Sequence, residues 1–175
     1  MNVLNLYMLE GTPLGFYESI KNTISSTFKG LMRVYRVGTA DLEYEKTFNR
    51  HRSQYNAYEI ARMASLSVLK PALIVMDLDF YVPGLNFVFG LVLDGVGLIS
   101  IKRLSSSFYG IPGNGDLHKR RVNVVALHEV GHLLGLGHCS NRSCCMSFHN
   151  SIWEVDKSNP QFCTVCWGKI LSVLK

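Results

Sequence analysis

Three histidines and one glutamate lie close together in this chain: His128, Glu129, His132 and His138. His128 and His132 are four positions apart, so on a helix their imidazoles lie on one face, one turn apart. Two nitrogens placed in this way can bind one zinc ion. Glu129 is adjacent to His128 and points away from the ligand face, where it can act as a general base.

The third histidine can join the first two only if the helix ends before it. His138 follows His132 by six residues, which on a continuing helix would turn it about 240° around the axis. Gly135 and Gly137 lie between them, and glycine accepts the left-handed conformation that ends helices. Three histidines leave the fourth position of a zinc ion open for water, as catalytic zinc requires. We therefore predict a catalytic zinc on the three histidines, with Glu129 as catalytic base.

All the cysteines lie near the C-terminus of the sequence: Cys139, Cys144, Cys145, Cys163 and Cys166. An odd number of cysteines without an export signal argues against a secreted disulfide framework. We expect a reducing, cytoplasmic setting, where clustered cysteines more often bind metal. Two disulfides, or free thiols, are the alternative.

The spacing of these residues resembles that of a known family. The motif HExxHxxGxxH at 128–138 is that of the metzincins. The continuation, with Cys139, Cys144, Met146 and then CxxC at 163–166, is similar to the archaemetzincin family. We associate that family with a spacer of about seventeen residues before CxxC, and here it is one residue shorter, a change that costs little in a loop. The resemblance covers residues 128–166.

The resemblance implies a second metal site. It assigns Cys139, Cys144, Cys163 and Cys166 to a structural zinc, because four thiolates complete a closed tetrahedral shell. It also implies that Met146 forms a methionine turn beneath the catalytic zinc, although the residue alone could equally be a core methionine. We therefore expect two zinc ions per chain.

The remaining cysteine and histidines are assigned no metal. Cys145 could replace Cys144 as a ligand, but the family spacing selects Cys144, so we expect Cys145 to be a buried free thiol. For His149 we favour a surface or core position over a place in the cleft. His51 and His118 have no suitable partners in the sequence.

The segments around the motif predict an α/β fold (α+β, zincin-like). We expect a mixed, twisted, mostly parallel sheet with helices, a long active-site helix and a small irregular zinc-bound C-terminal lobe. The hairpin signal at 94–97 requires one antiparallel pair. We expect helix 53–69 to open at Ser53, the long helix to be capped by Asn114 or Asp116, and 105–115 to be a loop. Strands are expected at 3–9, 31–38, 72–79, 86–93 and 97–102, and helices at 14–27, 53–69, 116–136 and 167–174.

Composition restricts the class of protein. The chain has 175 residues, 47% of them hydrophobic and 18% charged, which is typical of a globular protein. We expect a single catalytic domain, 1–175, with an upper subdomain at 1–137 and a lower one at 138–175. The start of the sequence lacks the features of a signal peptide, and no apolar run is long enough to cross a membrane. We expect a monomer.

Together these features predict a zinc metalloprotease that hydrolyses peptide bonds by Glu129-assisted attack of zinc-bound water. We expect a peptide or protein substrate that pairs with the strand at 86–93. One alternative is a zinc-containing peptide- or protein-binding module with little or no protease activity, against which the presence of Glu129 argues. A second is a nucleic-acid protein, suggested by the net charge of +5 and basic clusters such as 50–52. No nucleic-acid motif supports it.

Overall fold

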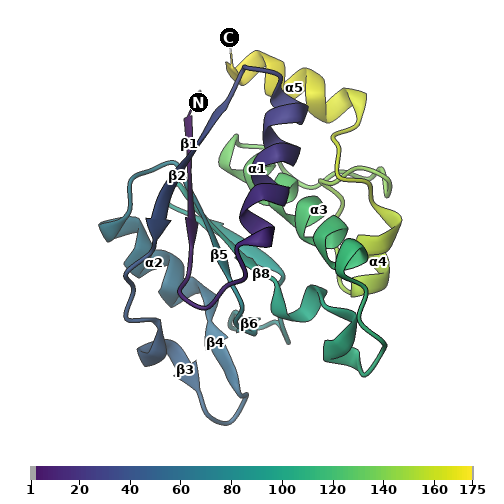
Figure 1. Cartoon of the computed structure of the whole chain (residues 1–175). Coiled ribbons are helices and arrows are strands. Elements are labelled where there is room, and N and C mark those ends of the chain that lie inside the picture. The colour runs from purple at the N-terminus through teal and green to yellow at the C-terminus, as the bar shows by residue number, and fades with distance from the viewer. Residues whose placement is uncertain (1–2, 175) are drawn as a thin grey trace.

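The centre of the protein is a five-stranded sheet, seen in a computed structural model that describes residues 3–174 (Figure 1). Neighbouring strands are parallel except for β7, which is antiparallel to β8. This confirms the predicted mixed, mostly parallel sheet. In spatial order the strands are β2 (Arg33–Thr39), β1 (Val3–Met8), β5 (Ala72–Met76), β8 (Val96–Ser100) and β7 (Gly90–Leu93).

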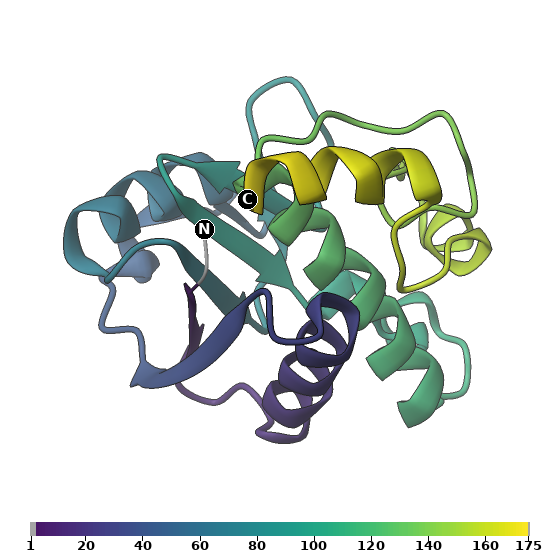
Figure 2. The same cartoon turned by 90° about the horizontal axis from the view of Figure 1, so that it is seen from above.

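Helices cover both faces of the sheet. α1 (Gly15–Phe28) and α3 (Gly115–Leu133) lie side by side on one face (Figure 2), and α2 (Ala57–Ser67) packs on the other. In β5, Leu73 and Val75 belong to the core on the α1–α3 side, whereas Ile74 and Met76 belong to the core on the α2 side. Because β5 is buried on both faces, its sequence is a continuous apolar run rather than an alternating one.

The C-terminal part of the chain packs against the α1–α3 side. It contains α4 (Ile152–Lys157) and α5 (Thr164–Leu174), so it has more helix than the sequence predicted. Trp167 of α5 lies against Phe28 at the end of α1, with ring centroids 5.7 Å apart. Within residues 3–174, no helix has the length and apolar character needed to cross a membrane.

Two predicted elements start elsewhere. α2 begins at Ala57, not near Ser53, because the side chain of Asn56 accepts the N–H groups of Tyr58 and Glu59 and caps the helix. Ser53 instead adopts φ +53°. The strand predicted at 86–93 is reduced to β7, and before it Val88 forms only an isolated antiparallel bridge with Phe80.

Short elements went unpredicted because two or three residues show no periodicity. They form a second sheet of β3 (Phe48–Asn49), β4 (Gln54–Asn56) and β6 (Phe80–Tyr81). The remaining short elements are the 3₁₀ turns η1 (Tyr44–Thr47), η2 (Lys102–Leu104) and η3 (Ser106–Tyr109), the last within the predicted loop.

A buried ion pair fastens the C-terminal segment to the long helix. The Arg121 guanidinium on α3 donates to both carboxylate oxygens of Asp156 on α4, each at 2.7 Å. Its Nη1 atom donates to the carbonyl of Leu104 and the hydroxyl of Ser106. Arg121 is only 2% exposed, so its charge depends on these partners.

We predict that Asp156→Ala lowers the free energy of unfolding by at least about 2 kcal/mol, because it leaves the Arg121 charge buried without its partner. Glu43→Ala is the control, since the Lys46–Glu43 pair is exposed and should contribute less than about 1 kcal/mol. Chemical denaturation measures both. Equal effects of the two substitutions would contradict the prediction.

Candidate metal centres and the adjoining cleft

The three motif histidines come together at the end of α3. His128 and His132 lie on one face of the helix, and their Nε2 atoms are 3.0 Å apart. The helix ends at Leu133, Gly135 has φ +86°, and the chain turns back. The His138 ring then lies 5.3 Å from that of His128 and 4.9 Å from that of His132, measured between centroids. One nitrogen of each histidine lies within 4.8 Å of the other two.

Hydrogen bonds determine which nitrogens face this shared space. The Nδ1 atom of His128 is 2.7 Å from the carbonyl of Cys145, and that of His132 is 2.7 Å from the carbonyl of Leu136. Because a carbonyl can only accept, each Nδ1 carries the proton and each Nε2 of the neutral ring presents a lone pair. Two lone pairs at 3.0 Å repel each other unless a cation lies between them, so the arrangement fits a metal ion.

The protonation behaviour of the histidines agrees with metal binding. Burial, with the nearby His132, lowers the pKa of His128 to about 3. Burial also lowers the pKa of His138. Both rings are therefore neutral at pH 7, which is the form that binds zinc.

Glu129 lies buried beside these histidines with an unused oxygen. The residue is 4% exposed, and within the described chain its Oε2 atom is the one buried side-chain oxygen or nitrogen without a hydrogen-bond partner. Burial raises the pKa of Glu129 to about 8. A cation bound at the adjacent histidines would favour the carboxylate form, and the unpartnered Oε2 atom is then suited to take up a proton.

Gly90 on β7 makes room for this carboxyl group. A Cβ atom at Gly90 would lie 2.3 Å from the Oε1 atom of Glu129 and 2.7 Å from the carbonyl of Leu98. Any side chain there would displace the glutamate or the edge strand. Sequence reasoning missed Gly90, because nothing local relates a strand residue to a helix residue so far along the chain.

Met146 packs directly under the histidine helix. It is fully buried, and a Cβ atom at Gly131 would lie 2.2 Å from its Sδ atom. Gly131 occupies an unspecified position of the HExxH motif, so the sequence did not single it out. The loop of Met146 is joined to the segment after His138, because Cys139 N–H donates to the Met146 carbonyl at 2.8 Å.

Four cysteines form a second cluster below the first. The sulfur atoms of Cys139, Cys144, Cys163 and Cys166 all lie within 4.8 Å of one another. The sulfur atoms of Cys139 and Cys163 are 3.8 Å apart, far longer than the roughly 2.05 Å of a disulfide. All the cysteines are free thiols.

Hydrogen bonds favour the thiolate form of Cys144, whereas burial raises the pKa of the Cys139 and Cys166 thiols. The thiol of Cys145 and the backbone N–H of Cys163 are among the groups that lower the pKa of Cys144 to about 4. The N–H of Asn141 donates to the sulfur of Cys139. Four sulfur atoms gathered in this way fit a metal ion, whose charge would favour the thiolate form. Cys145 itself is fully buried and free, as the sequence predicted.

A cleft of about 690 Å³ opens beside the histidines. Its walls are mostly apolar, and β7, the last strand of the sheet, runs along one side. His149 also lines the cleft, whereas the sequence had favoured a surface or core position for it; burial lowers the pKa of His149 to about 4. The lining consists of 85–92, Val125, His128, Glu129, His132, His138, Phe148, His149 and Asn150.

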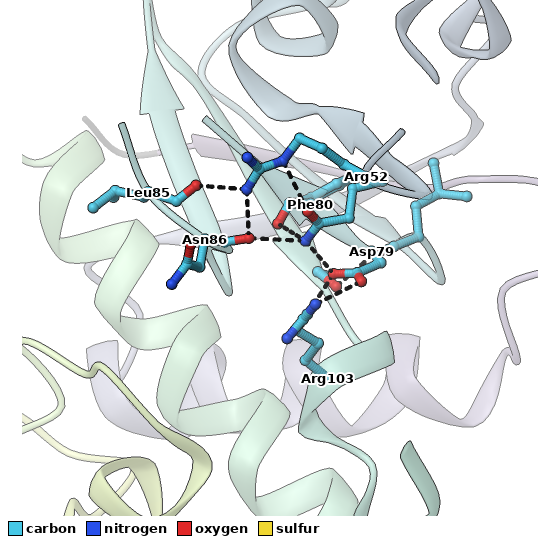
Figure 3. Close-up of polar contacts among 9 residues, drawn as sticks. Arg52, Asp79, Phe80, Leu85, Asn86 and Arg103 are labelled. Atoms are coloured by element: carbon cyan, nitrogen blue, oxygen red, sulfur yellow. Dashed lines mark hydrogen bonds and ion pairs between the residues drawn. The ribbon is translucent and has the colours of Figure 1, made fainter. Parts of the chain in front are cut away.

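A polar network holds the wall at 85–89 (Figure 3). Arg52 Nη2 donates to the carbonyls of Leu85 and Asn86 at 2.9 and 3.0 Å, and Gln54 Nε2 also donates to Asn86 at 3.0 Å. Asp79 accepts from Gln54 and from the guanidinium of Arg103.

Arg103 links this network to the wall itself, since its guanidinium carbon lies 4.6 Å from the ring centroid of Phe87. The sequence showed Arg52 only as part of a basic cluster, so the network was missed.

We predict that Asp79→Asn loosens this wall, because it weakens both the contact to Gln54 and the ion pair to Arg103. Hydrogen exchange of the amides at 85–89 should become about ten-fold faster. Glu59→Gln breaks an exposed pair with Arg62 and serves as the control. Unchanged exchange at 85–89 in Asp79→Asn would show that the network does not hold the wall.

Known peptidases resemble this chain in sequence over most of its length. Residues 24–172 match the model of Peptidase family M54. The archaemetzincin of Sulfolobus acidocaldarius is 41% identical over 127 residues, which cover 70% of this chain and 72% of that protein. The archaemetzincin of Methanocaldococcus jannaschii is 41% identical over 126 residues, covering 70% and 69%.

Solved structures are similar over almost the whole chain. The archaemetzincin of Methanopyrus kandleri superposes with a TM-score of 0.85 at 29% identity, covering 99% of this chain and 95% of that one. A zinc-dependent peptidase of Methanocorpusculum labreanum has a TM-score of 0.83 at 29% identity, covering 95% and 99%. The resemblance found in the sequence is confirmed: the chain belongs to peptidase family M54, the archaemetzincins, and is a zinc-dependent metallopeptidase.

Proposed function

We propose that His128, His132 and His138 bind the catalytic zinc and that Glu129 is the general base of peptide-bond hydrolysis. The observation that carries this proposal is the pair of facing Nε2 lone pairs, 3.0 Å apart, beside the unpartnered Oε2 atom of Glu129. Zinc in such a site lowers the pKa of a water molecule and polarises a carbonyl group.

The protein's own contribution is to place and move a proton. Glu129 takes up a proton at Oε2 and passes it to the nitrogen of the leaving amine. The unpartnered Oε2 atom supports this role because no other group of the described chain hydrogen-bonds to it. Gly90 supports it by leaving room for the carboxyl group against β7.

For the substrate, we propose an extended peptide that adds to the outer edge of β7. β7 is the terminal strand of the sheet, and Gly90, Leu91 and Val92 line the cleft. Main-chain hydrogen bonds to such an edge bind a peptide whatever its sequence. The binding-module alternative is not favoured, because the relatives are peptidases and Glu129 is placed as a base would be.

The four-cysteine cluster binds a second, structural zinc in this proposal, giving two ions per chain. Support comes from the close sulfurs and from the N–H groups that donate to them. The five free thiols suit a reducing compartment such as the cytoplasm. We further propose a monomer with one catalytic domain, in which 1–137 forms the upper and 138–175 the lower subdomain.

We predict that Glu129→Gln lowers kcat for peptide hydrolysis by a factor of roughly 100 to 10,000, while the protein keeps its zinc. Cleavage of a peptide library, with a parallel metal analysis, measures both quantities. Full activity in Glu129→Gln would refute the assigned base.

Gly90→Ala tests the placement of the base. We predict a kcat about 100-fold lower, because a displacement of about 1 Å at the reacting groups can cost that much. Gly113→Ala is the matched control, since nothing lies within 4 Å of a Cβ atom there and the residue has no positive φ. The same kcat for both variants would argue that Glu129 does not depend on Gly90.

Metal analysis tests the number of ions. We predict two zinc ions per chain, with the histidine-bound ion removed first by a chelator and activity lost with it. Cys163→Ser should lose one zinc and unfold more easily, because metal binding and folding are coupled. Cys145→Ala should keep both ions. A single zinc in the wild-type protein would contradict the two-ion proposal.

A further inference from the structure

His149 has one ring nitrogen committed to the protein. Its Nε2 atom lies 2.8 Å from the hydroxyl oxygen of Ser158, which is fully buried. The Ser158 hydroxyl donates its only proton to the carbonyl of Arg142, at 2.9 Å. The hydroxyl must therefore accept from His149, so the Nε2 atom carries the proton of the imidazole.

The other ring nitrogen is consequently an acceptor. In a neutral imidazole with its proton on Nε2, Nδ1 presents a lone pair. No group within residues 3–174 hydrogen-bonds to the Nδ1 atom of His149. This Nδ1 atom is also not buried. Within residues 3–174, the one buried side-chain nitrogen or oxygen without a hydrogen-bond partner is the Oε2 atom of Glu129. The ring lines the cleft, so its free lone pair is available there.

The position of the ring is close to where the peptide bond is cleaved. The centroids of the His149 and His128 rings are 5.5 Å apart. β7 offers backbone hydrogen bonds to one edge of an extended peptide. A peptide strand has N–H groups on both edges, and those on the edge away from β7 need acceptors when they leave water.

We propose that the Nδ1 atom of His149 accepts a hydrogen bond from a main-chain N–H of the bound peptide, beside the cleaved bond. The inference rests on the proposed function and adds a substrate-binding residue from the segment after Met146, in addition to β7. It also states a direction: this nitrogen accepts from the substrate and does not donate a proton to it.

Peptides with a single N-methyl group provide the test. A series places the methyl on each backbone nitrogen flanking the cleaved bond, and kcat/KM is measured for wild type, His149→Phe and His149→Asn, with zinc content as a check. Phenylalanine keeps a ring but has no acceptor, whereas the asparagine oxygen can occupy the place of Nδ1.

We expect His149→Phe to lower kcat/KM for the unmethylated peptide by about five- to ten-fold, and His149→Asn to lower it less. At one position, methylation should lower kcat/KM in wild type and His149→Asn but have little further effect in His149→Phe. Losses that are the same in wild type and His149→Phe at every position would overturn the inference while leaving the proposed function intact.

A wild-type protein that cleaves no peptide would contradict the inference and the proposed function together. Nitrogen-15 NMR of labelled histidine gives a second, independent reading. We expect the proton of His149 on Nε2, and a proton on Nδ1 would overturn the inference.

Discussion

The histidine site depends on two hydrogen bonds, made by the Nδ1 atoms of His128 and His132. Their acceptors are the carbonyls of Cys145 and Leu136, each 2.7 Å away. These bonds fix the tautomer of both rings and turn both Nε2 lone pairs into one space. Without them, two histidines on one helical face would be free to rotate away from each other.

One of these two acceptors links the cysteine cluster to the histidine site. The carbonyl that orients His128 belongs to Cys145, between Cys144 of the cluster and Met146 beneath the helix. Met146 can approach that closely only because residue 131 is a glycine. A zinc ion on the cysteines would therefore hold in place the loop that orients a ligand of the other zinc ion.

Features set by neighbouring residues could be predicted from the sequence, whereas features set by contacts between distant residues could not. The helical pair of histidines, the turn at Gly135 and the buried strand β5 follow from local periodicity and backbone preference, and the sequence predicted them. Gly90 could not be found, because its role comes from contact with Glu129 on another element. The position of His149 could not be decided, because its environment depends on Ser158 and on the cleft, neither of which a single sequence displays.

Competition between local signals accounts for the errors in the fold. Ser53 and Asn56 are both good helix caps, and the structure uses Asn56 because the preceding residues pair as β4. Residues 85–89 have an apolar, strand-like sequence, yet side chains of Arg52 and Gln54 donate to the carbonyls of Leu85 and Asn86. These long-range polar contacts hold the start of the predicted strand outside β7.

Zinc X-ray absorption spectroscopy on the purified protein is the most direct test of a histidine-bound and a cysteine-bound zinc ion, because it reports the ligands of the metal. Averaged over two ions, we expect about two sulfur ligands at roughly 2.3 Å and about two nitrogen or oxygen ligands at roughly 2.0–2.1 Å. After the more accessible ion is removed, the sulfur ligands alone should remain. A first shell made only of sulfur before any chelation would contradict the histidine-bound zinc.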